Sequence, residues 1–129
     1  MNTIKFLKLL VLAIVFASCS NDDDNTPQNH APVSEDMVVN MNENPTSDLV
    51  TVIEATDLDG DDLTYSIVSQ TPSDSVSINS ATGSIFVQDI DAFDYEQNTT
   101  ITVVIAVSDG VIITEFLLTI NILDVHEPG

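Results

Sequence analysis

From Pro32 onward, the chain is a series of short segments in which apolar and polar residues alternate, and turn residues end each segment. A period of two places the apolar side chains on one face of a β-strand, and this region has no 3.6-residue helical period. The alternating apolar positions are Met37, Val39 and Met41; Val50 and Val52; Leu63, Tyr65 and Ile67; Val76 and Ile78; Ile85 and Val87; Ile101, Val103, Ile105 and Val107; and Ile112, Phe116, Leu118, Ile120 and Ile122. Seven strands within about 95 residues predict an all-β fold, a seven-stranded antiparallel Greek-key β-sandwich.

Acidic residues far outnumber basic ones. The 129 residues include 21 Asp and Glu but only 2 Lys and Arg, giving a formal net charge of −19, and both cations, Lys5 and Lys8, lie near the N-terminus. Binding of nucleic acid or of an anionic membrane through basic contacts is therefore excluded. The single cysteine, Cys19, excludes a disulfide within the chain. With 43% hydrophobic residues, the chain can form one domain with a real core.

The first 18 residues have the pattern of a secretory signal peptide, in which Lys5 and Lys8 precede an apolar run at 9–17 and then small residues. The run is shorter than the roughly 20 apolar residues of a transmembrane helix, which favours cleavage over an uncleaved anchor. The FASC tetrapeptide at 16–19 resembles a bacterial lipobox, and the following SNDDD looks like the export signal of surface lipoproteins in the Bacteroidetes. The resemblance implies a bilayer-bound protein of the outer membrane or cell surface, lipidated at Cys19. Residues 19–31 then form an acidic flexible tether, and residues 32–129 form the folded domain.

If consecutive strands run in opposite directions, their connections sort onto two ends of the sandwich. The upper pole receives the segment before the first strand, the loop at 57–62 and the turn at 109–110, whereas the lower pole receives the loops at 43–48 and 89–98 and the end at 124–127. Most acids outside the tether follow this sorting: Asp57, Asp59, Asp61, Asp62 and Asp109 fall above, and Glu43, Asp48, Asp89, Asp91, Asp94, Glu96, Asp124 and Glu127 fall below. Any one Asp is explained as a turn residue.

The crowding of these acids at the poles needs a further explanation, because no Lys or Arg after Lys8 can offset their charge. Either the carboxylates are spread through water and screened, or a cation lies among them. Several hard oxygen ligands without a His/Cys cluster suit Ca²⁺ rather than zinc. Mg²⁺ fits less well, because it requires strict octahedral geometry and keeps its waters.

Six short motifs occur in a fixed order along the chain. They are NENP at 42–45, ATDLDG at 55–60 with LTYSI at 63–67, TGSI at 82–85, FDYE at 93–96, AVSDG at 106–110 and DVHEP at 124–128. Each resembles, in register, an element of a calcium-binding cadherin repeat: E-N-x-P, ATDxDxG with Y-S-I, T-G-x-I, L-D-R-E, A-x-D-x-G and the closing D-x-N-D/E-x-P linker. The resemblance runs from about Asn29 to Pro128, and it implies the cadherin-like β-sandwich fold.

The resemblance also implies calcium ligands at matching positions. These are Glu43, Asp94, Glu96, Asp124 and Glu127 at the lower pole, and Asp57, Asp59 and Asp109 in a weaker site at the upper pole, helped by Asn29 and His30 in place of the preceding linker. Two residues depart from the family pattern, since His126 replaces the linker Asn and Tyr95 replaces the Arg of the acidic pair. The sequence ends at Gly129, so we expect the lower site to hold its ion without a second repeat from this molecule.

An enzyme is not expected, because the two histidines lie in the tether and tail, and the carboxylate pairs occur only at the poles, where calcium explains them better. The leading hypothesis is a calcium-binding, membrane-anchored adhesion or interaction module of the cell surface. Its partner would be another protein or a cadherin-like domain. The alternative is a calcium-independent β-sandwich that serves as a spacer or accessory domain of a surface complex, for instance in glycan capture.

Overall fold

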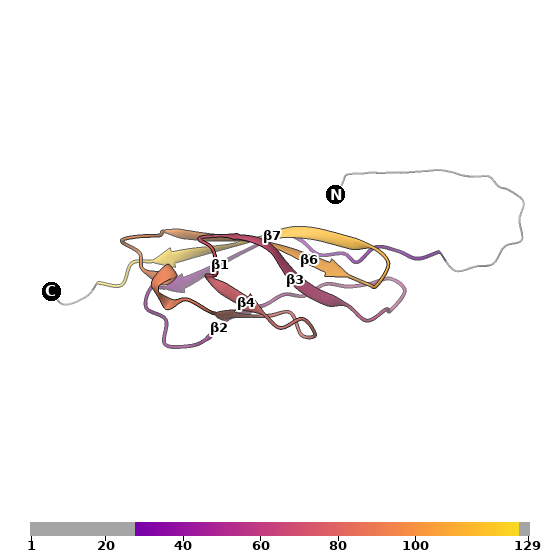
Figure 1. Ribbon diagram of the computed structural model, residues 1–129, viewed down its shortest axis with the longest axis horizontal. Coiled ribbons are helices and arrows are strands. Elements are labelled where there is room, and N and C mark those ends of the chain that lie inside the picture. The colour runs from indigo at the N-terminus through magenta and orange to yellow at the C-terminus, as the bar shows by residue number, and fades with distance from the viewer. Residues whose placement is uncertain (1–27, 127–129) are drawn as a thin grey trace, which may run out of the picture.

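Two β-sheets face each other in the computed structural model, which describes residues 28–126 (Figure 1). One sheet has four strands in the order β1-β7-β6-β3, and the other has three in the order β2-β5-β4. The strands are β1 (Met37–Asn42), β2 (Leu49–Val52), β3 (Thr64–Thr71), β4 (Val76–Ile78), β5 (Ser84–Val87), β6 (Thr100–Ser108) and β7 (Ile113–Leu123), with a short 3₁₀ helix η2 (Ile90–Phe93) before β6. The predicted all-β sandwich is confirmed, and each strand lies where the alternating pattern predicted it. Within the described residues, no helix is long and apolar enough to cross a membrane.

The pairing departs from a fully antiparallel sandwich at one place. β1 pairs with β7 in parallel, from Met37 opposite Leu118 to Asn42 opposite Leu123, while the other strand pairs are antiparallel. The first and last strands both run from the upper to the lower pole, so they can pair only in parallel once the fold places them side by side. This pairing brings the residues that follow β1 and β7 to the same end of the sheet.

The core lies between the two sheets and follows the period-two pattern. In β6, alternate residues Ile101, Val103, Ile105 and Val107 are fully buried. They pack in one cluster with buried side chains of the opposite sheet and of the loops, among them Ile53, Val76, Ile85 and Phe93. Burial of an aliphatic side chain contributes roughly 1.5–3 kcal/mol, so this layer is the main source of stability.

A side-chain hydrogen-bond pair and a glycine turn stabilise the smaller sheet. The Gln70 side chain donates from Nε2 to the Val76 carbonyl (3.1 Å) and accepts from the Val76 N–H (2.9 Å), so an amide covers part of the β4 edge. Gly83, in the β4–β5 turn, has φ +76°, and a Cβ there would lie 2.6 Å from the Ile53 carbonyl oxygen. Only glycine fits this position without strain.

The loops gather at two opposite ends, as the alternation of strand direction predicts (Figure 1). At the upper pole, Val33 and Thr56 form an isolated antiparallel bridge that holds the N-terminal segment against the β2–β3 loop. At the lower pole, the Glu43 N–H donates to the Leu123 carbonyl, and the Asn44 N–H donates to the Phe93 carbonyl, both at 3.0 Å. The two poles therefore join segments that are far apart in the sequence.

Candidate metal centres

Three carboxylates from three segments meet at the lower pole. Glu43, Glu96 and Asp124 each present an oxygen within 4.8 Å of the others. Glu43 follows β1 and Asp124 follows β7, and the parallel pairing of Asn42 with Leu123 brings them to one level. Two oxygens bound to the same Ca²⁺ at about 2.3–2.6 Å can lie up to about 5 Å apart, so this spacing fits a shared ion.

Glu43 is the most buried member of this cluster, since its side chain is only 4% exposed, whereas Glu96 and Asp124 are exposed. Its Oε2 accepts from the Tyr95 N–H (3.1 Å), and its Oε1 accepts from the Val125 N–H (2.8 Å). A buried carboxylate is costly unless it is hydrogen-bonded, and these two contacts reduce that cost. Each oxygen keeps a second lone pair with which it can bind a cation. Glu43 is therefore held in one orientation by the two loops that it joins.

Asp94 lies outside the set of three carboxylates and shapes the loop beside it. Its Oδ1 accepts from the Glu96 N–H (3.0 Å), and its Oδ2 accepts from the Gln97 side chain (2.8 Å). The hydrogen bond from Gln97, followed by those from Glu96, holds the pKa of Asp94 below its usual value. Asp94 therefore orients the turn that carries Glu96. Glu127, the fifth predicted lower ligand, lies outside the described residues.

The charges of the lower cluster act on Glu96. Its own backbone N–H lowers the pKa of Glu96, but the Glu43 charge, desolvation and the neighbouring Asp94 together outweigh that effect and raise the pKa above its usual value. A raised carboxyl pKa means that the neighbours disfavour the ionised form. A divalent ion among these acids would reverse this balance, because it favours every ionised carboxylate around it.

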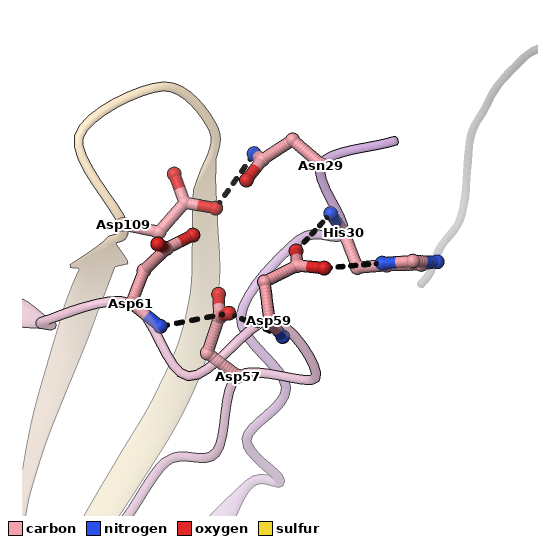
Figure 2. Close-up of polar contacts among 6 residues, drawn as sticks. All are labelled: Asn29, His30, Asp57, Asp59, Asp61 and Asp109. Carbon is pink, nitrogen blue, oxygen red and sulfur yellow. Dashed lines mark hydrogen bonds and ion pairs between the residues drawn. The ribbon is translucent and has the colours of Figure 1, made fainter. Parts of the chain in front are cut away.

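A second set of carboxylates meets at the upper pole, where Asp57, Asp61 and Asp109 bring oxygens within 4.8 Å of one another (Figure 2). Asp57 Oδ1 accepts from the N–H groups of Asp59 (2.8 Å) and Asp61 (3.3 Å). Asp57 Oδ2 is buried and has no hydrogen-bond partner among the described residues. A buried polar atom without a partner requires an explanation, and a bound cation provides one.

Asp109 is fixed by the turn that it begins. Its Oδ1 accepts from the N–H groups of Val111 (2.8 Å) and Ile112 (2.7 Å), and its Oδ2 accepts from the Asn29 amide (2.9 Å). The Ile112 hydrogen bond is the largest of the effects that lower the pKa of Asp109, so this carboxylate stays ionised. The N-terminal segment thus reaches the candidate metal centre through Asn29. The cadherin resemblance implied this, because it puts Asn29 and His30 in the place of a preceding linker.

Asp59, a predicted upper ligand, is not a member of the set of three and faces the N-terminal segment instead (Figure 2). Its Oδ2 accepts from the His30 N–H (2.6 Å), and its Oδ1 lies 2.9 Å from His30 Nδ1. These hydrogen bonds hold the pKa of Asp59 below its usual value, the backbone contact being the larger cause.

Asp61, and not the predicted Asp59, lies beside Asp57 and Asp109. The turn explains this, because Gly60 has φ +75° and its N–H donates to the Asp57 carbonyl (3.0 Å), which brings the chain back over Asp57. Desolvation and then the charge of Asp57, with smaller contributions from other nearby acids, raise the pKa of Asp61. The Asp-x-Asp-Gly-Asp spacing at 57–61 could have indicated Asp61, because a tight turn at Gly60 brings Asp61 back toward Asp57.

Both clusters consist only of carboxylates, with no His or Cys member. Such hard oxygen donors suit Ca²⁺, which takes 6–8 oxygens in flexible geometry. The buried Glu43 and the unpartnered Asp57 Oδ2 show that the carboxylates are more than solvated turn residues. The residues present at each pole therefore fit a calcium ion.

Solved structures of similar shape include cadherin ectodomains. The EC1–2 fragment of human protocadherin-24, form II, shares 27% identity at a TM-score of 0.66, over 74% of this chain and 46% of that one. Drosophila N-cadherin EC1–4 shares 21% at a TM-score of 0.62, over 75% of this chain and 25% of that one. The human desmocollin-1 ectodomain shares 24% at a TM-score of 0.59, over 91% of this chain and 22% of that one.

This chain spans less than half the length of these cadherin structures. No curated protein matches it in sequence. The model of the cadherin domain family matches residues 37–123, from the first residue of β1 to the last of β7. Because this match covers more than half of the chain, the protein belongs to the cadherin domain family, whose members are extracellular modules of the adhesion type.

Proposed function

We propose that this protein is a calcium-binding, non-catalytic adhesion or interaction module held at the bacterial cell surface by lipidated Cys19. The observation that carries the calcium proposal is the lower cluster, in which buried Glu43 is hydrogen-bonded to two loops and lies beside Glu96 and Asp124. The acidic poles, the lack of Lys or Arg after Lys8 and the cadherin family match support the same proposal.

The ion would act structurally. Glu43 already contacts the backbone of Tyr95 and Val125, and an ion shared with Glu96 and Asp124 would tie the same three segments a second time. The positive charge of the ion would offset the mutual repulsion of the carboxylates and fix the loops of the lower pole. A rigid pole loses less conformational entropy when it binds another protein or a cadherin-like domain, which favours adhesion.

Calorimetric titration of the purified protein with calcium tests the metal proposal. We expect dissociation constants of about 10⁻⁴–10⁻³ M, the range of extracellular calcium modules. Glu96→Gln should weaken the lower site about tenfold or more, since it removes one of few charged ligands. Glu115→Gln is the matched control, because Glu115 is exposed on β7 and outside both clusters. Equal affinity in the two variants would refute the lower site.

The alternative, a calcium-independent spacer or accessory domain, predicts a different outcome. The thermal midpoint would be the same in calcium and in chelator. Neutralising Glu96 would leave stability unchanged or raise it, because the repulsion that raises its pKa is relieved.

Lipidation is tested separately, by the partition of the expressed protein between detergent and aqueous phases. The unaltered chain should enter the detergent phase, since about 0.8 kcal/mol per buried methylene makes two or more acyl chains a firm anchor. Cys19→Ala should leave the protein unlipidated, whereas Ser20→Ala should have no effect. Metabolic labelling with a fatty acid that follows the same pattern would confirm the site.

A further inference from the structure

The upper pole exposes large apolar side chains next to its carboxylates. Leu58 and Val111 are each 78% exposed, and Ile113 and Val33 are 64% and 60% exposed. Leu58 lies between Asp57 and Asp59 in the chain, and the Val111 N–H is bonded to Asp109, so the most exposed apolar side chains and the acids share the same loops. Single exposed apolar residues are ordinary, but several at one tip indicate an interaction surface.

The N-terminal segment leaves the domain from this same pole. Asn29 and His30 bond to Asp109 and Asp59, so the start of the described chain is held at the upper pole (Figure 2). About 10 residues separate Cys19 from Asn29, and a fully extended chain of that length reaches at most about 35 Å. For scale, the hydrocarbon core of a bilayer is about 30 Å thick, so the tether is no longer than about one bilayer. If Cys19 is lipidated, this tether keeps the upper pole within about 35 Å of the membrane surface.

We propose that the upper pole docks on a lipid bilayer through Leu58 and Val111, with a calcium ion at Asp57, Asp61 and Asp109 between the protein and the phosphate headgroups. The inference rests on the proposed function for the ion and for the anchor. It adds the surface that the upper pole contacts, and it leaves the lower pole, at the opposite end, facing away from the membrane.

The ion is required by the charge of the pole. Phosphate headgroups repel bare carboxylates, and the described residues contain no Lys or Arg to attract them. Calcium takes 6–8 oxygens, so three carboxylates leave positions that phosphate oxygens can fill. A bound Ca²⁺ offsets most of the charge of the three carboxylates and so weakens their repulsion of the headgroups. Exposed apolar side chains such as Leu58 and Val111 can then enter the interface, where their burial is favourable. Docking should therefore occur in calcium and not in chelator.

The test uses tryptophan fluorescence, because the chain has no tryptophan of its own. Full-length Leu58→Trp protein is reconstituted into vesicles of phosphatidylcholine and phosphatidylglycerol that contain brominated acyl chains, which quench a nearby indole. Val111→Trp is a second reporter, in case the first change disturbs its loop. Ile90→Trp is the matched control, since Ile90 is 51% exposed on η2 near the lower pole.

In calcium, we expect the brominated acyl chains to quench the emission of the Leu58 and Val111 reporters, because both would lie at the interface, and we expect the emission to recover in chelator. The Ile90 reporter should be unaffected in both conditions. Calorimetry on the same variants measures calcium binding separately. Calcium binding without quenching would overturn membrane docking but not the proposed function, and would leave the tip free for a protein partner. Equal quenching at all three positions, or quenching that persists in chelator, would also overturn the inference.

Discussion

Replacing Glu43 with glutamine separates the two roles that the structure gives this side chain. In the folded protein, both Glu43 oxygens accept backbone N–H groups, and the side chain is 4% exposed. Glutamine has the same shape, but one of its two positions becomes an NH₂ group that faces an N–H donor. One charge-assisted hydrogen bond is lost, and a buried donor is left without a partner.

The magnitude depends on calcium. In chelator, the lost hydrogen bond and the unsatisfied donor should lower the free energy of unfolding by about 1–3 kcal/mol. Relief of the repulsion with exposed Glu96 is screened by water and is the smaller effect. At about 1 mM calcium, with a dissociation constant of about 10⁻⁴–10⁻³ M, ion binding stabilises the unaltered fold by a further 0.4–1.4 kcal/mol or so. The variant should lose that increment as well.

Urea unfolding in calcium and in chelator measures both parts, with Glu115→Gln as the control of equal charge change. An equal loss in the two conditions would show that no ion binds at Glu43. No loss in chelator would show that the bonds from Tyr95 and Val125 do not contribute to stability, and the account of this pole would be wrong.

Three further predictions use the same assay. Ile105→Ala, in the fully buried layer of β6, should cost about 2–5 kcal/mol. Gly83→Ala should cost about 2–4 kcal/mol, because its Cβ would meet the Ile53 carbonyl, whereas Gly110→Ala, with φ +98° and open space, should cost only about 1–2 kcal/mol. In chelator, Asp61→Asn should stabilise the protein at pH 7. The raised pKa of Asp61 means that its ionised form opposes folding, so the benefit should disappear as the pH falls below the ordinary Asp value of 3.8, where the carboxyl is neutral in both states. A benefit that persists in acid would contradict the assigned cause.

The strands could be predicted from the sequence because their signal is local. A strand with one buried face must alternate, and every second residue of β6 from Ile101 to Val107 is indeed buried. The sorting of loops to two poles followed from strand direction alone. The neighbour of β1 could not be predicted, because the parallel pairing of Met37 with Leu118 depends on the closure of the whole sheet.

The candidate sites were harder to predict residue by residue. The choice between Asp59 and Asp61 depends on the turn at Gly60 and on His30, which lies 29 residues away from Asp59 in the chain. The role of Asp94 likewise depends on the side chain of Gln97. Family motifs locate the acidic loops, but side-chain hydrogen bonds decide which carboxylates converge. The signal peptide, lipidation at Cys19 and the contribution of Glu127 stay predictions, because they lie outside the described residues.

The parallel pairing of β1 with β7 has a mechanical consequence. The described chain starts at one pole and ends at the other, so a force that pulled its N-terminal end and the lower pole apart would run along these two strands (Figure 1). The hydrogen bonds between β1 and β7 are roughly perpendicular to this force, so the force loads them in shear. The ladder from Met37 to Asn42 would have to rupture together, rather than unzip bond by bond, before the module yielded.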